Sequence, residues 1–276
     1  MRRPLWLSAV RLLLLGLVLI WSGLPILLVV LASLKPSRDV FEFPPRLIFR
    51  PTFENYTVLF EKWPAFAPSL LNSLIIAVGA TLLTVAVCTL GGYAYARFRS
   101  RLLAGSAFFM IFLRMLPPII ITLPLFPVVN YLKVNDTHAV LILLYATFYV
   151  SLGTWIMKAF IDQVPREVDE AAEIDGATVL QTILRVITPL AAQGIVAVSV
   201  FVAIFSWNEF IFAFIFASTR AKTGPLILSE MLSGIEAVDW GVLFAGATIQ
   251  VLPILVFTIA VQRFVVAGLT VGSVKG

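Results

Sequence analysis

Residues 12–34 read LLLLGLVLIWSGLPILLVVLASL, an uncharged run of 23 residues between Arg11 and Lys35. A transmembrane helix needs about 20 mostly apolar residues to cross about 30 Å of hydrocarbon, so this run is long enough to span a bilayer. A basic start before an apolar run also occurs in cleaved signal peptides. This run is longer than the core of a signal peptide, and no small-residue cleavage site follows it. We therefore expect a retained first transmembrane helix.

The composition of the whole chain agrees with a membrane protein. Hydrophobic residues make up 60% of the 276 residues, charged residues make up 13%, and the mean hydropathy is +1.01. A soluble domain is about half apolar and a quarter charged, so the composition excludes an ordinary soluble protein. A single cysteine, Cys88, excludes an intrachain disulfide, and a single histidine, His138, cannot build a metal cluster. The net charge of +5 is therefore informative through its distribution among the loops and gives no sign of a nucleic-acid partner.

Further uncharged runs along the chain are also long enough to span a membrane. They are residues 63–96, 115–132, 139–157, 186–208 and 241–262. They are continuously apolar and do not alternate with polar residues, which favours helices over barrel strands. We predict an all-α membrane protein with six transmembrane helices. The expected spans are residues 11–33, 70–96, 104–129, 139–158, 194–217 and 241–263.

Six spans place both termini on the same side of the membrane. With cytoplasmic termini, the inner segments carry 11 basic residues and the longer outer segments carry 8, as the positive-inside rule favours. The predicted organisation is then a first helix and outer loop at 1–69, a transmembrane domain at 70–263 and a cytoplasmic tail at 264–276. The transmembrane domain contains a long inner loop at 159–193.

The inner loop holds the most informative segment, DQVPREVDEAAEIDGAT at residues 162–178. Pro165 suits the first turn of a helix, and the acidic residues after it favour the positive end of that helix. We expect Gly176 to end the helix. A second amphipathic stretch then leads to Pro189, where the next span begins.

One face of this short helix has the spacing of a docking surface. Val168, Ala171, Ala172 and Asp175 share that face, and the small alanines would let a partner approach closely. The alternative is a helix that lies on the lipid surface. Six acidic residues between positions 162 and 175 favour a soluble partner, because an anionic leaflet attracts basic helices.

The loop resembles a family motif. Glu170-Ala171-Ala172, three residues, Gly176, nine residues and then 186–189 (VITP) resemble the EAA motif of ABC importer permeases, E-A-A-x3-G-x9-I-x-L-P. The chain departs from that motif at Val186 and Thr188, which lie in the stretch that leads into the next span.

Other segments are similar to the MalG-like permeases of binding-protein-dependent carbohydrate ABC importers, and the similarity covers nearly the whole chain. They are Asn72-Ser73, YAYARF at 93–98, WNEF at 207–210 and GLTVGSVKG at 268–276. The resemblance implies a type I importer fold whose transmembrane domain is 70–263. It also implies a transport subunit, not an enzyme, in a bacterial or archaeal cell membrane.

The resemblance also implies the partners of the chain. They are a second homologous permease, two ATPase subunits and an extracytoplasmic solute-binding protein, with a sugar-like cargo and no nucleic acid. The residues expected to couple to the ATPase are Glu170, Ala171, Ala172, Asp175, Gly176, Ala177 and Pro189, and Gly272 and Lys275 of the tail are expected to contact it. The chain contains no G-x-x-x-x-G-K-[ST] loop, so we expect it to bind no cofactor itself and ATP and Mg to bind the partner ATPase.

Two charges fall inside predicted spans. Arg114 and Glu209 would lie well within the third and fifth spans, where charges normally face a bundle interior or an aqueous cavity. They could pair or flank a cargo path, or lie separately near membrane borders. Trp207 and Asn208 beside Glu209 could contact a sugar or hold helices together by hydrogen bonds. The Pro117-Pro118 pair after Arg114 predicts either a broken helix beside a cavity or a simple kink.

Two other classes of function remain open on the sequence alone. An ion-coupled secondary transporter could use Arg114 and Glu209 as a coupling pair, and a structural membrane protein would need no pathway. Within the importer class, a glycerol-phosphate-type cargo is an alternative to a neutral sugar.

Overall fold

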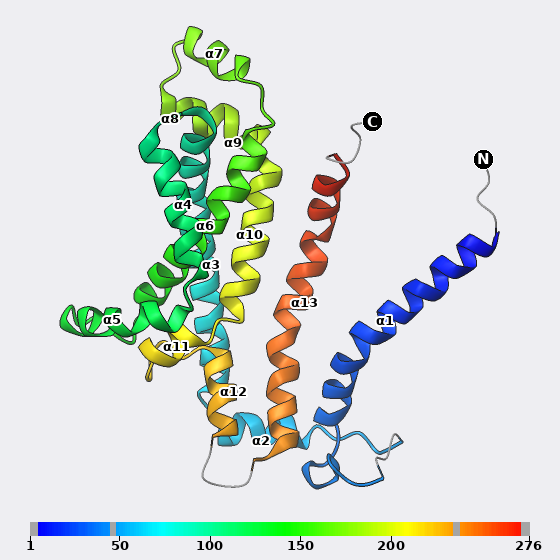
Figure 1. Cartoon of the computed structure of the whole chain (residues 1–276). Helices are drawn as coiled ribbons and strands as arrows, with labels where there is room; N and C mark the ends of the chain where they lie inside the picture. The colour runs from blue at the N-terminus through cyan, green and yellow to red at the C-terminus, as the bar shows by residue number, and fades with distance from the viewer. Residues whose placement is uncertain (1–4, 45–47, 234–237, 272–276) are drawn as a thin grey trace. The chain divides into compact units, whose positions relative to one another are not determined.

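The computed structural model describes the backbone of residues 5–44, 48–233 and 238–271, and every regular element in these ranges is a helix (Figure 1). Side chains are described for residues 10–44, 48–233 and 238–262. The all-α prediction is therefore confirmed for the described part of the chain. Gly272 and Lys275, the expected tail contacts, lie outside it.

The chain divides into two compact units. The first unit comprises Met1–Ala67 with Ile227–Leu252, and the second comprises Pro68–Leu226 with Pro253–Gly276. The first unit contains α1 (Leu5–Ser33), α2 (Glu54–Lys62), most of α12 (Gly224–Leu232) and the first part of α13 (Trp240–Val271).

The chain between α1 and α2 is held to α2 by one amide. The Nδ2 of Asn55 donates to the carbonyl oxygens of Ser33 at 2.7 Å and Lys35 at 2.6 Å. The Ser33 and Tyr56 hydroxyls bond to each other at 2.7 Å. The predicted outer loop at 35–69 therefore contains a helix and a polar anchor, whereas most apolar side chains of α1 are exposed, as in a helix that faces lipid.

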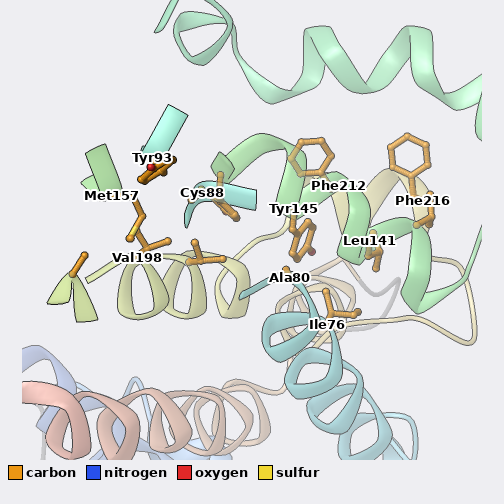
Figure 2. Close-up of a cluster of buried hydrophobic side chains, with 14 of the residues drawn as sticks. Ile76, Ala80, Cys88, Tyr93, Leu141, Tyr145, Met157, Val198, Phe212 and Phe216 are labelled. Carbon is orange, nitrogen blue, oxygen red and sulfur yellow. The ribbon is translucent and has the colours of Figure 1, made fainter. Parts of the chain in front are cut away.

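The second unit is built around two long helices and several shorter ones. They are α3 (Phe66–Arg97), α4 (Arg101–Met115), α5 (Pro118–Tyr131), α6 (His138–Ile161), α10 (Ala192–Trp207) and α11 (Ile211–Phe216). Their shared core contains Ile76 of α3, Tyr145 of α6 and Val198 of α10 (Figure 2). A Cβ on Gly92 would lie 2.7 Å from the Cβ of Met157, so only glycine permits this close crossing of α3 and α6.

Four described helices are long and apolar enough to span a membrane: α1, α3, α6 and α13. Two bent helix pairs bring the number to as many as six if each pair counts as one span. Four to six candidate spans agree with the class of fold that we predicted.

The third predicted span, 104–129, differs from the structure. The chain breaks at Leu116-Pro117, and α4 and α5 meet at 97°. Leu116 is extended, with ψ 131°, as expected for a residue before proline. Pro118 then starts α5 in the first helical turn, where no backbone N–H is needed. The structure therefore contains a broken helix at the proline pair, whereas a cavity beside this break stays a prediction.

The fifth predicted span, 194–217, is also interrupted. Helix α10 ends at Trp207, and α11 begins at Ile211. Glu209 lies in the break, so its charge is not in the middle of a continuous helix.

Candidate functional site: the inner loop and the buried charges

The predicted docking helix is α7 (Glu167–Ile174), and Figure 1 shows it beyond the ends of α3, α4 and α6. Glu167, Asp169 and Glu170 lie in its first turn, where negative charge stabilises the helix dipole. Gly176 ends the helix with φ +79°, as predicted. The N–H of Ala177 then donates to the carbonyl of Ala172 at 2.9 Å, and the N–H of Gly176 donates to the carbonyl of Glu173 at 3.0 Å. These two bonds are the glycine-terminated helix end known as a Schellman motif.

The face of α7 that contacts the rest of the chain differs from the predicted docking face. Ala172 is buried and Val168 is half-buried, whereas Ala171 and Asp175 are exposed. The helix is turned so that Ala172 and Asp169 face the protein. The side that remains open to a partner carries Glu170, Ala171, Glu173, Ile174 and Asp175. Ile174 is 86% exposed, so this acidic side has an apolar tip.

An ion pair fastens α7 to the end of α3. The Nε and Nη2 of Arg97 donate to Oδ2 of Asp169 at 2.9 and 2.8 Å, and Nη2 also donates to the Val164 carbonyl at 3.0 Å. The two side chains are only 8% and 16% exposed. Sequence reasoning missed this pair because the residues are 72 positions apart and each belongs to a different predicted segment.

The second arm of the loop starts at Thr178. Its hydroxyl accepts from the N–H of Gln181 at 3.4 Å, and its own N–H donates to Oε1 of Gln181 at 2.9 Å. This reciprocal capping box starts α8 (Val179–Gln181), which continues through η2 (Thr182–Ile187), a π-helical segment, and α9 (Thr188–Leu190). The arm bends by 82° into α10 at Ala191, so Pro189 lies just before the bend.

Only part of the apolar face expected for this arm, Ala177, Leu180, Ile183, Leu184 and Ile187, is buried against the chain. Ile183 and Ile187 are buried, whereas Leu180 and Leu184 are exposed. Helix α7 contacts η2, so the two arms of the loop support each other.

Arg114 and Glu209 have separate partners, and no ion pair joins these two described residues. The guanidinium carbon of Arg114 lies 5.5 Å from the ring centre of Phe148 and 5.6 Å from that of Phe201. The Glu209 carboxylate accepts from the N–H groups of Phe212 at 2.9 Å and Ala213 at 3.3 Å. Glu209 therefore caps the start of α11, and Arg114 stacks on aromatic rings.

The two charges nevertheless border one aromatic cluster. The Phe148 ring centre lies 5.7 Å from that of Phe212, whose N–H binds Glu209. The Tyr145 hydroxyl lies beside Glu209, and Figure 2 shows Tyr145 next to Phe212. The two side chains therefore lie at one aromatic cluster without pairing, and their role in a cargo path stays a prediction.

Trp207 and Asn208 lie in different surroundings from Arg114. Trp207 is buried and lines an apolar cavity of about 200 Å³ between α3, α10 and α13, together with Ala203 and Phe257. Asn208 is exposed, and its Nδ2 donates to the Ile204 carbonyl of its own helix at 2.8 Å. The structure thus brings Arg114 and Glu209 to one cluster and leaves Trp207 and Asn208 outside it.

A further polar site holds the loop between α11 and α12, and sequence reasoning missed it. Asp136, between α5 and α6, accepts from the N–H groups of residues 218–221 at 2.9–3.1 Å and from the Thr219 hydroxyl at 2.6 Å. Partial burial opposes ionisation, but the bonds from Arg220, Thr219 and their neighbours hold the pKa of Asp136 well below its usual range. The carboxylate therefore stabilises this loop above the ordinary pKa of a carboxyl group and loses that effect as the pH falls through the lowered pKa.

The same loop is held from α3 as well. The Nδ2 of Asn72 donates to the carbonyls of Arg220 at 2.8 Å and Lys222 at 2.9 Å. Its Oδ1 must then accept from Nε2 of His138, 2.7 Å away. Ser73 accepts from the N–H of Gly224 at 2.9 Å. The Asn72-Ser73 pair quoted for its resemblance is therefore a structural anchor here.

Long apolar helices, breaks beside the half-buried charges Arg114 and Glu209, and a projecting loop are features of a polytopic membrane protein. The chain belongs to the family of binding-protein-dependent transport system inner membrane components, whose model matches residues 87–271. It is therefore a transport component and a multi-pass protein of the cell membrane.

Relatives support the same assignment, including the resemblance to MalG-like permeases. The chain is 35% identical over 267 residues to the trehalose transport system permease protein SugB of Mycobacterium tuberculosis, covering 94% of this chain and 95% of SugB. It is 34% identical over 237 residues to the trehalose/maltose transport system permease protein MalG of Thermococcus litoralis, covering 84% of each.

A solved structure shares the fold. It is a crystal structure of a bacterial ABC transporter involved in the import of the acidic polysaccharide alginate. One of its chains superposes with a TM-score of 0.77 and 20% identity, covering 93% of this chain and 95% of that chain.

Proposed function

We propose that this chain forms half of the translocation pathway of an ATP-driven importer for a sugar or sugar derivative. Membership of the permease family and relatives named for trehalose and maltose support this cargo class. A second homologous permease would supply the other half of the pathway. An extracytoplasmic solute-binding protein would deliver the cargo, and two ATPase subunits with bound ATP and Mg would drive transport.

The proposal includes the topology. The four long helices would cross the membrane together with the two bent pairs, as six spans with both termini cytoplasmic, and α7 would then lie on the cytoplasmic side. The tail at 264–276 lies on that side as well, where Gly272 and Lys275 would reach the ATPase.

The fastening of α7 to α3 is the observation that carries the coupling mechanism. The outward side of α7 is free to dock on the ATPase, while Arg97 and Asp169 tie its inward side to α3. Movement of α7 would therefore be transmitted to a spanning helix. The second arm of the loop, which bends by 82° into α10 after Pro189, would transmit the same movement to α10.

Each coupling residue has a role in this mechanism. Glu170, Ala171 and Asp175 form the docking side, and Ala172 packs α7 against its own chain. Gly176 and Ala177 set the turn between the two arms. Closure of the ATPase dimer would then change the access of the pathway from one side of the membrane to the other.

The pathway itself would run beside the aromatic cluster of α6, α10 and α11. Arg114 and Glu209 both border that cluster, so they are the strongest candidates for contact with cargo or for gating. Trp207 and Asn208 are candidates at a separate place, the cavity beside α13 and the exposed end of α10.

Purification of the tagged chain from its native membrane tests the class of protein. We expect a second permease and an ATPase to arrive in a ratio of 1:1:2, and uptake into vesicles to require ATP. Uptake that follows an ion gradient without any ATPase would instead identify a secondary transporter. Binding of neutral sugars and of glycerol phosphates to the partner binding protein then distinguishes the two cargo classes.

A further inference from the structure

A pocket of about 470 Å³ lies on the second unit, between the end of α3 and the start of the inner loop. Four cationic side chains line it: Arg97, Arg99, Lys158 and Arg166. Asp162 is the acidic side chain in its lining. A pocket so rich in cations has the chemistry of an anion-binding site.

Two of the four cations are already neutralised. Arg97 pairs with Asp169, and Lys158 pairs with Asp162 four residues along the same chain segment. Arg166 donates only through Nη2 to the backbone carbonyl of Ala96 at 3.3 Å and, at 3.5 Å, to that of Arg97. Arg99 is exposed and has no ion pair or hydrogen bond to the described residues. About two positive charges therefore remain uncompensated, carried by Arg99 and Arg166.

The pocket lies where the membrane span ends. Residues 63–96 carry no charge, and Arg97 is the last residue of α3. In the segment that follows Arg97, Phe98 is 56% exposed and Leu102 is 84% exposed, and these two residues flank Arg99 and Arg101 in the sequence. Exposed apolar side chains next to cations are typical of a segment at the boundary between headgroups and acyl chains.

We propose that this pocket binds the phosphate headgroup of an anionic phospholipid such as phosphatidylglycerol. Arg99 and Arg166 hold the phosphate, while Phe98 and Leu102 contact the first part of the acyl chains. Basic pockets between spanning helices bind such headgroups, and each nearby cation strengthens the attraction. The apolar side chains explain why a lipid, and not a free phosphate ion, occupies the pocket.

This site has a consequence for the coupling loop. Arg166 directly precedes α7, and Arg97 is the residue that fastens it. A bound headgroup therefore neutralises charge beside the acidic helix and connects α3 to the start of the loop. The assignment depends on the pocket itself and holds for any cargo.

Native mass spectrometry of the intact transporter tests the proposal. The complex is released from nanodiscs of phosphatidylcholine that contain a minor fraction of phosphatidylglycerol, and retained phosphatidylglycerol is counted. The double variant Arg99→Gln/Arg166→Gln should retain about 30-fold less than wild type, which corresponds to about 2 kcal/mol for two cations. The matched control Arg38→Gln/Lys62→Gln removes two exposed cations elsewhere and should retain as much as wild type.

Equal retention by the double variant and wild type would overturn the proposal. If the double variant does not assemble, the wild-type complex is labelled with a photoactivatable phosphatidylglycerol, and the labelled segments are identified. Label within 95–101 or 158–166 supports the site, and label confined to other segments overturns it. Displacement of the label by inorganic phosphate would assign the pocket to a free anion, and protection only by the ATPase subunits would assign it to a protein contact. Either result would also overturn the lipid site.

Discussion

The inner loop and the aromatic cluster around Arg114 and Glu209 are organised in opposite ways. In the loop, the decisive hydrogen bonds join residues three to five positions apart, as between Ala177 and Ala172. In the cluster, the contacts join residues from α4, α6, α10 and α11. Arg114 stacks on Phe201, for example, although the two residues are 87 positions apart in the sequence. The loop is therefore specified by local chemistry, whereas the cluster exists only in the folded bundle.

The largest expected effect comes from breaking the local turn at Gly176. The variant Gly176→Leu should lower ATP-driven uptake at least about ten-fold while the complex still assembles. A nonglycine residue in this left-handed conformation costs only about 1–2 kcal/mol. A Cβ there meets no described atom of this chain within 4 Å, so the leucine side chain would occupy open space where the proposed ATPase docks. Uptake per assembled complex is the measurement.

The variant Gly176→Asn is the matched control, because asparagine tolerates this backbone conformation and is smaller. It should retain more uptake than the leucine variant. Wild-type uptake by Gly176→Leu would contradict the coupling role of the turn.

The same contrast explains which features could be predicted from sequence. The helix over 167–174, its glycine end and the apolar spans follow from periodicity, capping and length, which are local properties. The prediction of the docking face of α7 was wrong in part. Asp169 pairs with Arg97, and Ala172 on the predicted face packs against the chain. No periodicity within α7 contains that information.

The membrane interior was less predictable for a related reason. Charge counts located Arg114 and Glu209 in spans and offered them only as partners of each other, whereas their partners in the structure are aromatic rings and backbone N–H groups. The proline pair at 117–118 indicated a break, but its 97° angle depends on how α4 and α5 pack against their neighbours. The Asp136 anchor was missed because the donors to its carboxylate are backbone N–H groups 82–85 residues away, which no side-chain motif reveals.

The next largest effect should come from the ion pair that joins the inner loop to α3, Arg97 with Asp169. Removal of one partner from a largely buried ion pair leaves a charge without compensation and costs about 3–5 kcal/mol. We expect Arg97→Ala to lower the melting temperature of the complex and to reduce uptake strongly. The exchange Arg97→Asp/Asp169→Arg should restore part of both.

Lys158→Ala provides the control for this experiment. Its pair with Asp162 is more exposed, with the side chains at 29% and 43%, and joins residues four apart. Such a pair contributes about 0.3–0.5 kcal/mol, so stability should hardly change. Equal losses in Arg97→Ala and Lys158→Ala would show that α7 is not fastened by Arg97.

A smaller effect is expected at the aromatic cluster. Arg114→Leu should cost about 2 kcal/mol through loss of stacking on two desolvated rings. Glu209→Ala should cost about 1 kcal/mol through loss of the cap on α11. Since the two side chains have separate partners, the double variant should be additive within about 0.5 kcal/mol in thermal melting. Rescue by the exchange Arg114→Glu/Glu209→Arg would instead demonstrate direct pairing.

The smallest effect tests whether the second arm of the loop is as local as the first. Thr178→Ala removes one half of the capping box and should cost about 1 kcal/mol, since the N–H of Gln181 loses its acceptor. Thr178→Ser retains the hydroxyl and should behave as wild type. Hydrogen exchange should accelerate about five-fold for the amides of 179–182 in the alanine variant, and the amides of α10 should not change. If exchange also accelerates across α10, the cap contributes to the 82° bend as well, and the arm depends on contacts beyond its own residues.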